Sequence, residues 1–197
     1  MDGDEICGRK VEAADLAAEL LKNREFFEMN GGGVTFTGGE PTMQADFLCE
    51  VLDLLHGVHK AIETCGYCSR EVFQRVLDRV DLVLFDIKHT DPVAHKRWTR
   101  VDNAPILANL ETLKRSGSPF VIRVPLIPGV NDSLENMEAT RELVKDAPGL
   151  QRVELLRYHK TAGAKYAKVD MTYDPGFDTE AIPAVHDIFG DIKTIIL

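Results

Sequence analysis

Short apolar runs recur along the chain, and longer segments with a helical spacing of apolar residues separate them. The runs are rich in Val, Ile, Leu and Phe and are bounded by polar residues or glycine, as buried strands are. We therefore predict six strands. They cover residues 34–37, 61–64, 82–87, 120–124, 153–156 and 192–196.

Two of the intervening segments carry clear helix signals. Asn103 can cap a helix that ends at Gly117, and either Asp132 or Ser133 can cap a second helix. Strands and helices therefore alternate along the chain. The apolar residues of the two helices are Ile106, Leu110 and Leu113 in the first and Leu134, Met137 and Val144 in the second.

This alternation predicts an α/β fold. Parallel strands need crossover connections, which are right-handed, so the sheet is either an open doubly wound sheet or a full or partial barrel. A chain of 197 residues with 44% hydrophobic residues is long enough to bury one core of ordinary size. We expect residues 1–197 to form a single domain.

Composition narrows the function classes only slightly. The 32 acidic and 23 basic residues are spread along the chain and give a net charge of -9, which argues against a nucleic-acid partner. No stretch has the length and apolarity of a membrane span, and the acidic residues 1–5 do not resemble a signal peptide. We therefore expect a cytoplasmic protein without membrane contact.

The four cysteines are too few for a disulfide framework in a chain of this length. Cys65 and Cys68 form a CxxC pair, which would suit a redox motif or half of a zinc site. Neither Cys7, Cys49 nor a nearby His pair completes a metal site by spacing. We expect Cys65 and Cys68 to be free thiols without a metal, at a turn between a strand and a helix.

Polar residues gather where the expected strands end. The carboxyl ends of parallel strands meet at one edge of a sheet, and ligands bind there in both candidate architectures. This placement predicts a ligand site. The residues at these ends are Gly38, Gly39, Glu40, Glu63, Asp86, Lys88 and His159.

Glycines flank the first expected strand on both sides. Gly38 and Gly39 follow it and leave the backbone open to close approach by a ligand, although ordinary glycine-rich turns are the alternative. Glu40 favours a ligand, because a carboxylate at the mouth of a parallel sheet can bind an ammonium group.

Asp86 and Lys88 lie two residues apart on one strand, so their side chains project from the same face. The two groups could pair with each other, or Lys88 could hold the carboxylate of a ligand. Glu63 on the neighbouring strand is a second carboxylate near Asp86, and two such groups invite a cation between them. His159 by itself is unremarkable, since most lone histidines have no such function.

Five motifs occur in order, each at a strand end: residues 31–41, 62–67, 86–88, 123–132 and 155–159. Together they resemble the activating enzymes of pyruvate formate-lyase and its relatives, the radical S-adenosylmethionine enzymes that act on glycyl-radical enzymes. The resemblance covers nearly the whole chain, whereas the Gly-Gly-Glu sequence alone would be weak evidence.

The resemblance implies roles for the residues at the strand ends. Gly38, Gly39 and Glu40 would bind the amino group of the methionine part of S-adenosylmethionine. Lys88 would bind the methionine carboxylate, which agrees with the argument from charge. His159 would lie beside the ribose or the adenine.

The resemblance also implies roles for residues on the neighbouring strands. Arg123 and Val124 would belong to the same ligand site, where residues 124–127 form an apolar wall near the adenine. Arg123 is also a candidate for contact with the protein substrate. Glu63 and Asp86 would hold a monovalent cation, although the activator of pyruvate formate-lyase has Asp where this chain has Glu63.

The fold implied by the resemblance is a partial parallel (β/α) barrel. The intact enzyme would use a 4Fe-4S cluster to cleave S-adenosylmethionine, giving a 5'-deoxyadenosyl radical that takes hydrogen from a backbone glycine of its partner. A flavodoxin or ferredoxin would donate the electron. The partner would be a glycyl-radical enzyme, but dehydratases, lyases and decarboxylases share this kind of activator, so the sequence leaves the partner open.

The family carries a CxxxCxxC loop after its first strand, and no such triplet occurs in this sequence. Residues 5–11 resemble the segment that follows an inserted ferredoxin-like domain in many relatives. We expect that the chain begins after that insert, without the first strand and the cluster loop. We also expect the chain to be inactive by itself.

Two other function classes remain open. A βα-barrel lyase or isomerase would use Lys88 as an amine nucleophile with Glu40 or Asp86 as a general base, and borohydride trapping on Lys88 would support it. A noncatalytic remnant would keep only the pocket for the nucleoside.

Overall fold

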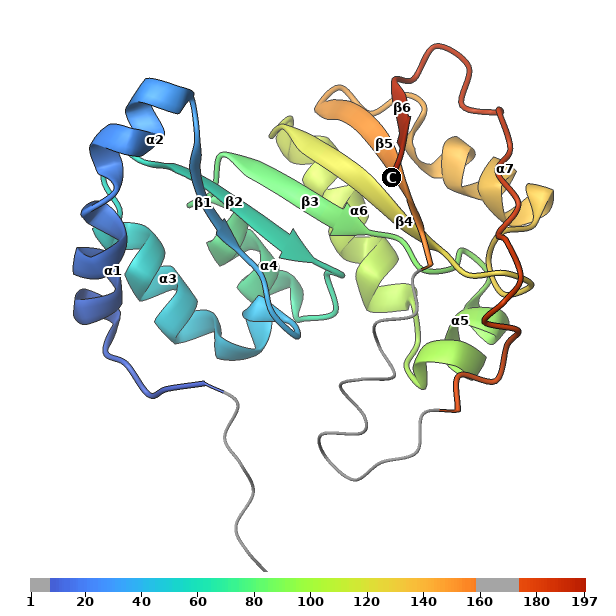
Figure 1. Cartoon of the computed structure of the whole chain (residues 1–197), viewed down its shortest axis with the longest axis horizontal. Coiled ribbons are helices and arrows are strands. Elements are labelled where there is room, and N and C mark those ends of the chain that lie inside the picture. The colour runs from blue at the N-terminus through green and yellow to red at the C-terminus, as the bar shows by residue number, and fades with distance from the viewer. Residues whose placement is uncertain (1–7, 159–173) are drawn as a thin grey trace, which may run out of the picture.

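The computed structural model describes residues 8–158 and 174–197, which contain one six-stranded sheet. Neighbouring strands are parallel, and their spatial order is their order along the chain (Figure 1). All six predicted strands are confirmed, with small shifts at their ends. They are β1 (Gly33–Phe36), β2 (His59–Thr64), β3 (Leu82–Asp86), β4 (Phe120–Leu126), β5 (Leu150–Arg157) and β6 (Thr194–Ile196).

The strand order decides between the two architectures that the sequence left open. A doubly wound sheet reverses its strand order at a switch point, and its helices cover both faces. In this chain every connection leads to the next strand in the same direction, so right-handed crossovers place the helices on one face. Figure 1 shows α3, α4 and α6 behind the sheet, as in a partial barrel.

The described residues form seven α-helices and a short 3-10 helix, η1. The α-helices are α1 (Ala13–Leu21), α2 (Arg24–Asn30), α3 (Ala45–Leu54), α4 (Arg70–Leu77), α5 (Pro92–Thr99), α6 (Ala104–Ser116) and α7 (Leu134–Val144), and η1 is Pro41–Gln44. In this part of the chain no helix combines the length and apolarity needed to cross a membrane.

The two faces of the sheet differ in chemistry, because neighbouring residues of a strand point to opposite faces. On the helix side, Phe85 and Ile122 pair in register, are fully buried and belong to the main hydrophobic core. On the opposite face, Asp86 pairs in register with Arg123, and Glu63 occupies the same face of β2. One face of the sheet is therefore buried in the hydrophobic core, and the other carries charged side chains.

The predicted helices α6 and α7 are confirmed, but their first turns differ from expectation. Asn103 precedes α6 without capping it, because its side-chain amide instead donates a hydrogen bond to the carbonyl of Thr90 at 2.8 Å. Gly117 ends α6 in the left-handed conformation that glycine favours. Ser133, and not Asp132, caps α7 through its hydroxyl group.

The N-terminal helix α1 packs outside the main core. Its buried residues Ala13 and Ala17 meet Val51 and Leu55 at α3 in a separate, smaller hydrophobic cluster. The small side chains of the two alanines let the helices approach closely. This contact supports the β1 end of the sheet, where the candidate site begins.

Candidate functional site

The loop after β1 is open to solvent. Gly38 has a φ of 144°, which side chains other than glycine rarely adopt, and Gly39 follows it. A Cβ atom on either glycine would meet no other atom within 4 Å. Packing therefore does not explain both glycines, and the backbone of this loop is accessible to a ligand.

Glu40 ties this loop to the end of β2. Its Oε1 accepts hydrogen bonds from the hydroxyl groups of Thr42 and Thr64, each at 2.7 Å, and from the Thr42 backbone N–H at 3.2 Å. Its Oε2 accepts from the backbone N–H of Cys65 at 2.9 Å and from the Cys65 thiol at 3.1 Å. The sequence predicts Glu40 as a ligand-binding residue, but it does not reveal this network of hydrogen bonds.

The network shifts the acidity of both partners. Burial is the largest single influence on the pKa of Glu40 and raises it, but hydrogen bonds from Thr64, Cys65 and Thr42 together outweigh burial and lower the pKa. Burial, reinforced by the hydrogen bond to Glu40, raises the pKa of Cys65 to about 11. Glu40 is therefore an anion at neutral pH, while Cys65 stays a thiol that donates to it.

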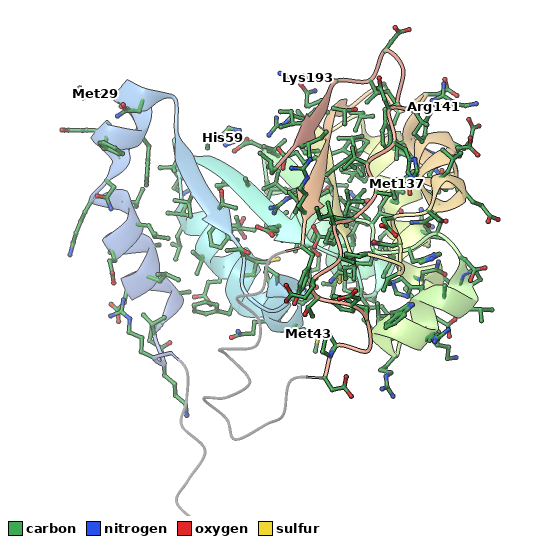
Figure 2. The ribbon with its side chains drawn as sticks, turned by 45° about the vertical axis from the view of Figure 1, so that its right-hand side comes forward. Met29, Met43, His59, Met137, Arg141 and Lys193 are labelled. Carbon is green, nitrogen blue, oxygen red and sulfur yellow. The ribbon has the colours of Figure 1, made fainter. Side chains whose placement is uncertain are left out.

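Glu40 and Lys88 line the same small cavity, of about 210 Å³, although they come from the ends of different strands. Met43 is 76% exposed and also lines this cavity. Figure 2 shows Met43 at the opposite end of the sheet from His59, the first residue of β2, so the cavity lies at the carboxyl ends of the strands. The remaining lining residues are Cys65, Tyr67, His95, Thr99, Val101 and Ile106.

Asp86 and Lys88 do not pair with each other. Ile87 between them is buried in the core, so the two polar side chains project to the other face, as predicted. Within residues 8–158 and 174–197, the structure shows no hydrogen bond or ion pair for the side chain of either one. Their charges thus remain available to a ligand.

Burial dominates the acidity of Asp86 and raises its pKa to about 6. The positive charges of Lys88 and Arg123 pull the pKa of Asp86 down, while the negative charges of Glu63 and Glu40 push it up. The five charged side chains therefore lie close enough to influence one group. Asp86 is mostly ionised at neutral pH, but its charge is poorly compensated.

Arg123 and Glu63 are engaged with other side chains of the chain itself. Arg123 Nη1 lies 2.5 Å from Glu63 Oε1, and Arg123 Nε lies 3.4 Å from Glu154 Oε2. Glu63 Oε2 also accepts a hydrogen bond from the Thr37 hydroxyl at 3.3 Å. The expected pair of Glu63 and Asp86 is thus not arranged around a common cation.

The position of Val124 corrects the expected apolar wall. Val124 has no exposed surface and belongs to the core on the helix side of the sheet, so its side chain cannot reach a ligand on the other face. Pro125 and Ile127 instead line a second cavity of about 520 Å³, together with Lys88. The period of two along a strand places these alternate residues on the face opposite the core.

Helix α5 supplies residues that sequence analysis missed. His95 and Thr99 line both cavities beside Lys88, and Trp98 lines the larger one. His95 is buried; its Nδ1 lies 2.9 Å from the carbonyl of Val101, and within the described part of the chain its Nε2 has no hydrogen-bond partner.

The signal for α5 was present in the sequence. Asp91 caps this helix by accepting a hydrogen bond from the Ala94 N–H at 2.7 Å, and Pro92 occupies the first turn. An Asp-Pro pair is a common start of a helix. From that start, the helical spacing would have placed His95 and Thr99 on one face.

One expected site residue cannot be placed. His159 lies outside the described residues, so its expected place beside the ribose or adenine stays a prediction.

Cys49, Cys65 and Cys68 form no disulfide. Over the described ranges, no group of three or more His, Cys, Asp or Glu side chains could hold a metal ion. The described residues therefore do not fit an iron–sulfur cluster.

Known proteins match both the sequence and the fold. The model of the radical SAM superfamily matches residues 4–144. The trans-4-hydroxy-L-proline dehydratase activating enzyme of Clostridioides difficile is 41% identical over 174 residues, 86% of this chain and 58% of that enzyme. The pyruvate formate-lyase-activating enzyme of Listeria monocytogenes is 35% identical over 174 residues, 84% of this chain and 70% of that enzyme.

A solved structure agrees with these matches. A domain of the pyruvate-formate lyase-activating enzyme from Bacteroides vulgatus superposes with a TM-score of 0.63 and 28% identity, over 84% of this chain and 98% of that domain. The chain spans little more than half the length of the C. difficile relative. On these grounds the chain belongs to the radical SAM superfamily and, within it, to the family of glycyl-radical enzyme activating enzymes.

Proposed function

We propose that this chain forms the part of a glycyl-radical enzyme activating enzyme that binds the methionine end of S-adenosylmethionine. The observation that carries the proposal is the cavity of about 210 Å³ that Glu40 and Lys88 line together. A free amino acid carries an ammonium and a carboxylate group on one carbon. An anionic and a cationic side chain at one small cavity complement that pair of charges.

Each residue contributes differently to this binding. Lys88 has no partner among the described residues, so its ammonium group can bind the carboxylate of the ligand without breaking an existing contact. Glu40 already accepts five hydrogen bonds from its own chain, and we therefore assign it to positioning. It ties the loop that contains Gly38 and Gly39 to the end of β2 and keeps a negative charge beside the ligand's ammonium group.

The nucleoside would extend from this cavity along the polar face. Pro125 and Ile127 offer an apolar surface in the adjoining cavity of about 520 Å³, and Lys88 borders both spaces. In this family, S-adenosylmethionine supplies the radical chemistry together with a 4Fe-4S cluster. Because the described residues do not fit the cluster, we assign no step of that reaction to them.

The partner follows from the relatives. The C. difficile and L. monocytogenes enzymes are named for activating trans-4-hydroxy-L-proline dehydratase and pyruvate formate-lyase. We propose that the whole protein likewise activates a glycyl-radical enzyme, with a flavodoxin or ferredoxin as electron donor.

Calorimetric titration of this chain with S-adenosylmethionine tests the proposal. Lys88→Met removes the charge but keeps the length of the side chain, so binding should weaken roughly 10- to 150-fold, the equivalent of about 1.5 to 3 kcal/mol. Lys22→Met, at the exposed end of α1, is the matched control and should bind like the parent.

The choice of ligand sharpens this test. Free methionine should compete with S-adenosylmethionine and lose affinity in Lys88→Met, whereas 5'-deoxyadenosine, which lacks the amino-acid group, should bind both proteins equally. Equal binding of S-adenosylmethionine by the parent and Lys88→Met would show that the methionine end of the ligand does not bind in this cavity. Borohydride trapping of a carbonyl compound on Lys88 would support the lyase or isomerase instead.

A further inference from the structure

Four charged side chains form a continuous chain on the polar face of the sheet. Arg123 of β4 lies between Glu63 of β2, at 2.5 Å, and Glu154 of β5, at 3.4 Å. Arg152 then contacts Glu154 through Nε at 2.8 Å and Nη2 at 2.7 Å. The signs alternate along this row, which we call the charge ladder, so its four charges cancel.

The charge ladder occupies the oxygens that a cation would need. A metal ion held by Glu63 and Asp86 requires an oxygen of each directed at the same point. Glu63 Oε1 contacts Arg123, and its Oε2 accepts from Thr37. Among the described residues of this face near Arg123, Asp86 is the carboxylate without an ion pair, and one carboxylate does not make a metal site. The residues present therefore do not fit a bound monovalent cation.

Side-chain length explains why the guanidinium reaches Glu63. The two residues lie on β2 and β4, with β3 between them, so their backbones are about 10 Å apart at a strand spacing of about 4.8 Å. Arg and Glu are both long enough to meet across β3. An aspartate at position 63 would be shorter by one carbon–carbon bond, about 1.5 Å, and would lose this contact.

The same guanidinium acts on Asp86. Asp86 and Arg123 are register partners on adjacent strands, so the positive charge lies beside the carboxylate without forming an ion pair with it. Arg123 is among the groups that lower the pKa of Asp86. The site thus already contains a fixed positive charge in the place where a cation would offset Asp86.

We propose that Arg123 is the internal cation of this site: its guanidinium, which forms a close ion pair with Glu63 and a longer one with Glu154, takes the place of a bound monovalent metal ion. Arg123 is then a positioning residue, which orients Glu63 and offsets Asp86 next to the Lys88 cavity. The inference deepens the proposed function and rests on it only for the ligand at that cavity. Removing the guanidinium should turn the site into one that needs a metal ion.

Thermal unfolding without S-adenosylmethionine tests this inference. The parent protein should show the same unfolding midpoint in potassium, sodium and choline chloride at equal ionic strength. Arg123→Gln leaves Glu63, Asp86 and Glu154 without the guanidinium, so its midpoint should be lower in choline. Potassium or sodium should raise the midpoint of this variant saturably, by about 3 to 6 °C at tenfold excess over its Kd.

Matched variants separate charge from structure. Arg123→Lys keeps the charge and should not respond to potassium, and Arg79→Gln, which removes an exposed ion pair with Asp53, should not respond either. Glu63→Asp should gain a potassium response, and it provides the test if Arg123→Gln does not fold. A saturable response of the parent to potassium or sodium would overturn the inference, as would the absence of a response in both Arg123→Gln and Glu63→Asp.

These outcomes are independent of the proposed function. A parent protein that binds S-adenosylmethionine but is stabilised by potassium would contradict only the role of Arg123. A parent protein that unfolds identically in all three salts but fails to bind S-adenosylmethionine would contradict only the proposed function.

Discussion

The ends of β1 and β3 both bring a carboxylate to the site, but the two carboxylates differ in hydrogen bonding and in the direction of their pKa shifts. Glu40, after β1, accepts hydrogen bonds from Thr42, Thr64 and Cys65, and its pKa lies below the usual value. Asp86, at the end of β3, has no such partner among the described residues, and burial raises its pKa to about 6.

The difference between the two carboxylates suggests different roles: Glu40 fixes the shape of its loop, whereas Asp86 is left unpaired among the described residues at the site. On the β1 side, the chain satisfies its own carboxylate and thereby fixes the shape of the Gly38–Gly39 loop. On the β3 side, Asp86 and Lys88 keep unsatisfied charges at a cost in stability, which a ligand can offset when it binds. A preformed wall on one side and free charges on the other suit a small charged ligand.

Removing Glu40 should produce the largest effect on stability. Glu40→Ala leaves the hydroxyl groups of buried Thr42 and Thr64 and the N–H of Cys65 without their acceptor, so we expect a loss of about 2 to 5 kcal/mol in unfolding free energy. Urea unfolding measures it, with Glu50→Ala on the exposed side of α3 as the control. A loss no greater than in the control would mean that the network does not hold the loop.

Asp86→Asn should increase the unfolding free energy, and the size of this increase should depend on pH. Because the pKa of Asp86 is about 6 in the folded protein and lower when unfolded, the folded state binds more protons between these values. The unfolding free energy contributed by this group therefore falls as pH rises from about 4 to about 6. A pKa difference of about 2 corresponds to about 3 kcal/mol, so the variant should exceed the parent by about 1 to 3 kcal/mol at pH 7.

The pH profile supplies the control for this prediction. Parent and Asp86→Asn should become equally stable below about pH 3, where the carboxyl group is mostly protonated in both the folded and the unfolded state, and Asp187→Asn should follow the parent throughout. Glu40, whose pKa is lowered, contributes stability above its usual pKa that is lost as pH falls through the folded value. Equal stability of Asp86→Asn and the parent at pH 7 would show that Asp86 is solvated.

Two neighbouring glycines on the β1 side should respond differently to alanine. Gly38 has a φ of 144°, so Gly38→Ala should cost about 1 to 2 kcal/mol of stability through backbone strain. Gly39 lacks a positive φ and has open space around it, so Gly39→Ala should leave stability unchanged. Any effect of Gly39→Ala should instead appear as weaker binding of S-adenosylmethionine in calorimetry. Equal stability of the two variants would contradict the assigned strain.

The smallest effect is expected on the β3 side, at the end of α5. Arg100 ends this helix with a φ of 70° and is the non-glycine residue with positive φ among those described. Arg100→Gly relieves about 1 to 2 kcal/mol of strain but loses part of it to the greater freedom of unfolded glycine, so we expect a net gain of about 0.5 to 1 kcal/mol. Arg97→Gly, inside the same helix, should instead destabilise the protein. Urea unfolding of both variants makes the comparison.

The family and the strands whose ends form the candidate site could be predicted from the sequence because they depend on local order along the chain. Apolar runs of strand length located all six strands, and the motifs at their ends contain Glu40 and Lys88, which line one cavity. The alternation of a strand placed Asp86 and Lys88 on one face without reference to any other element. The same alternation, applied one residue further along β4, would have placed Val124 in the core.

The sequence by itself thus determined the strands, their parallel α/β arrangement and the residues at their carboxyl ends, since periodicity and turn chemistry act over a few residues. Only the tertiary structure decided that the sheet winds in one direction and that Glu40 bonds to the β2 end. It also decided that Arg123 reaches Glu63 across β3. These contacts join residues 24 to 60 positions apart, and their geometry depends on strand order, curvature and side-chain length together, which no local pattern encodes.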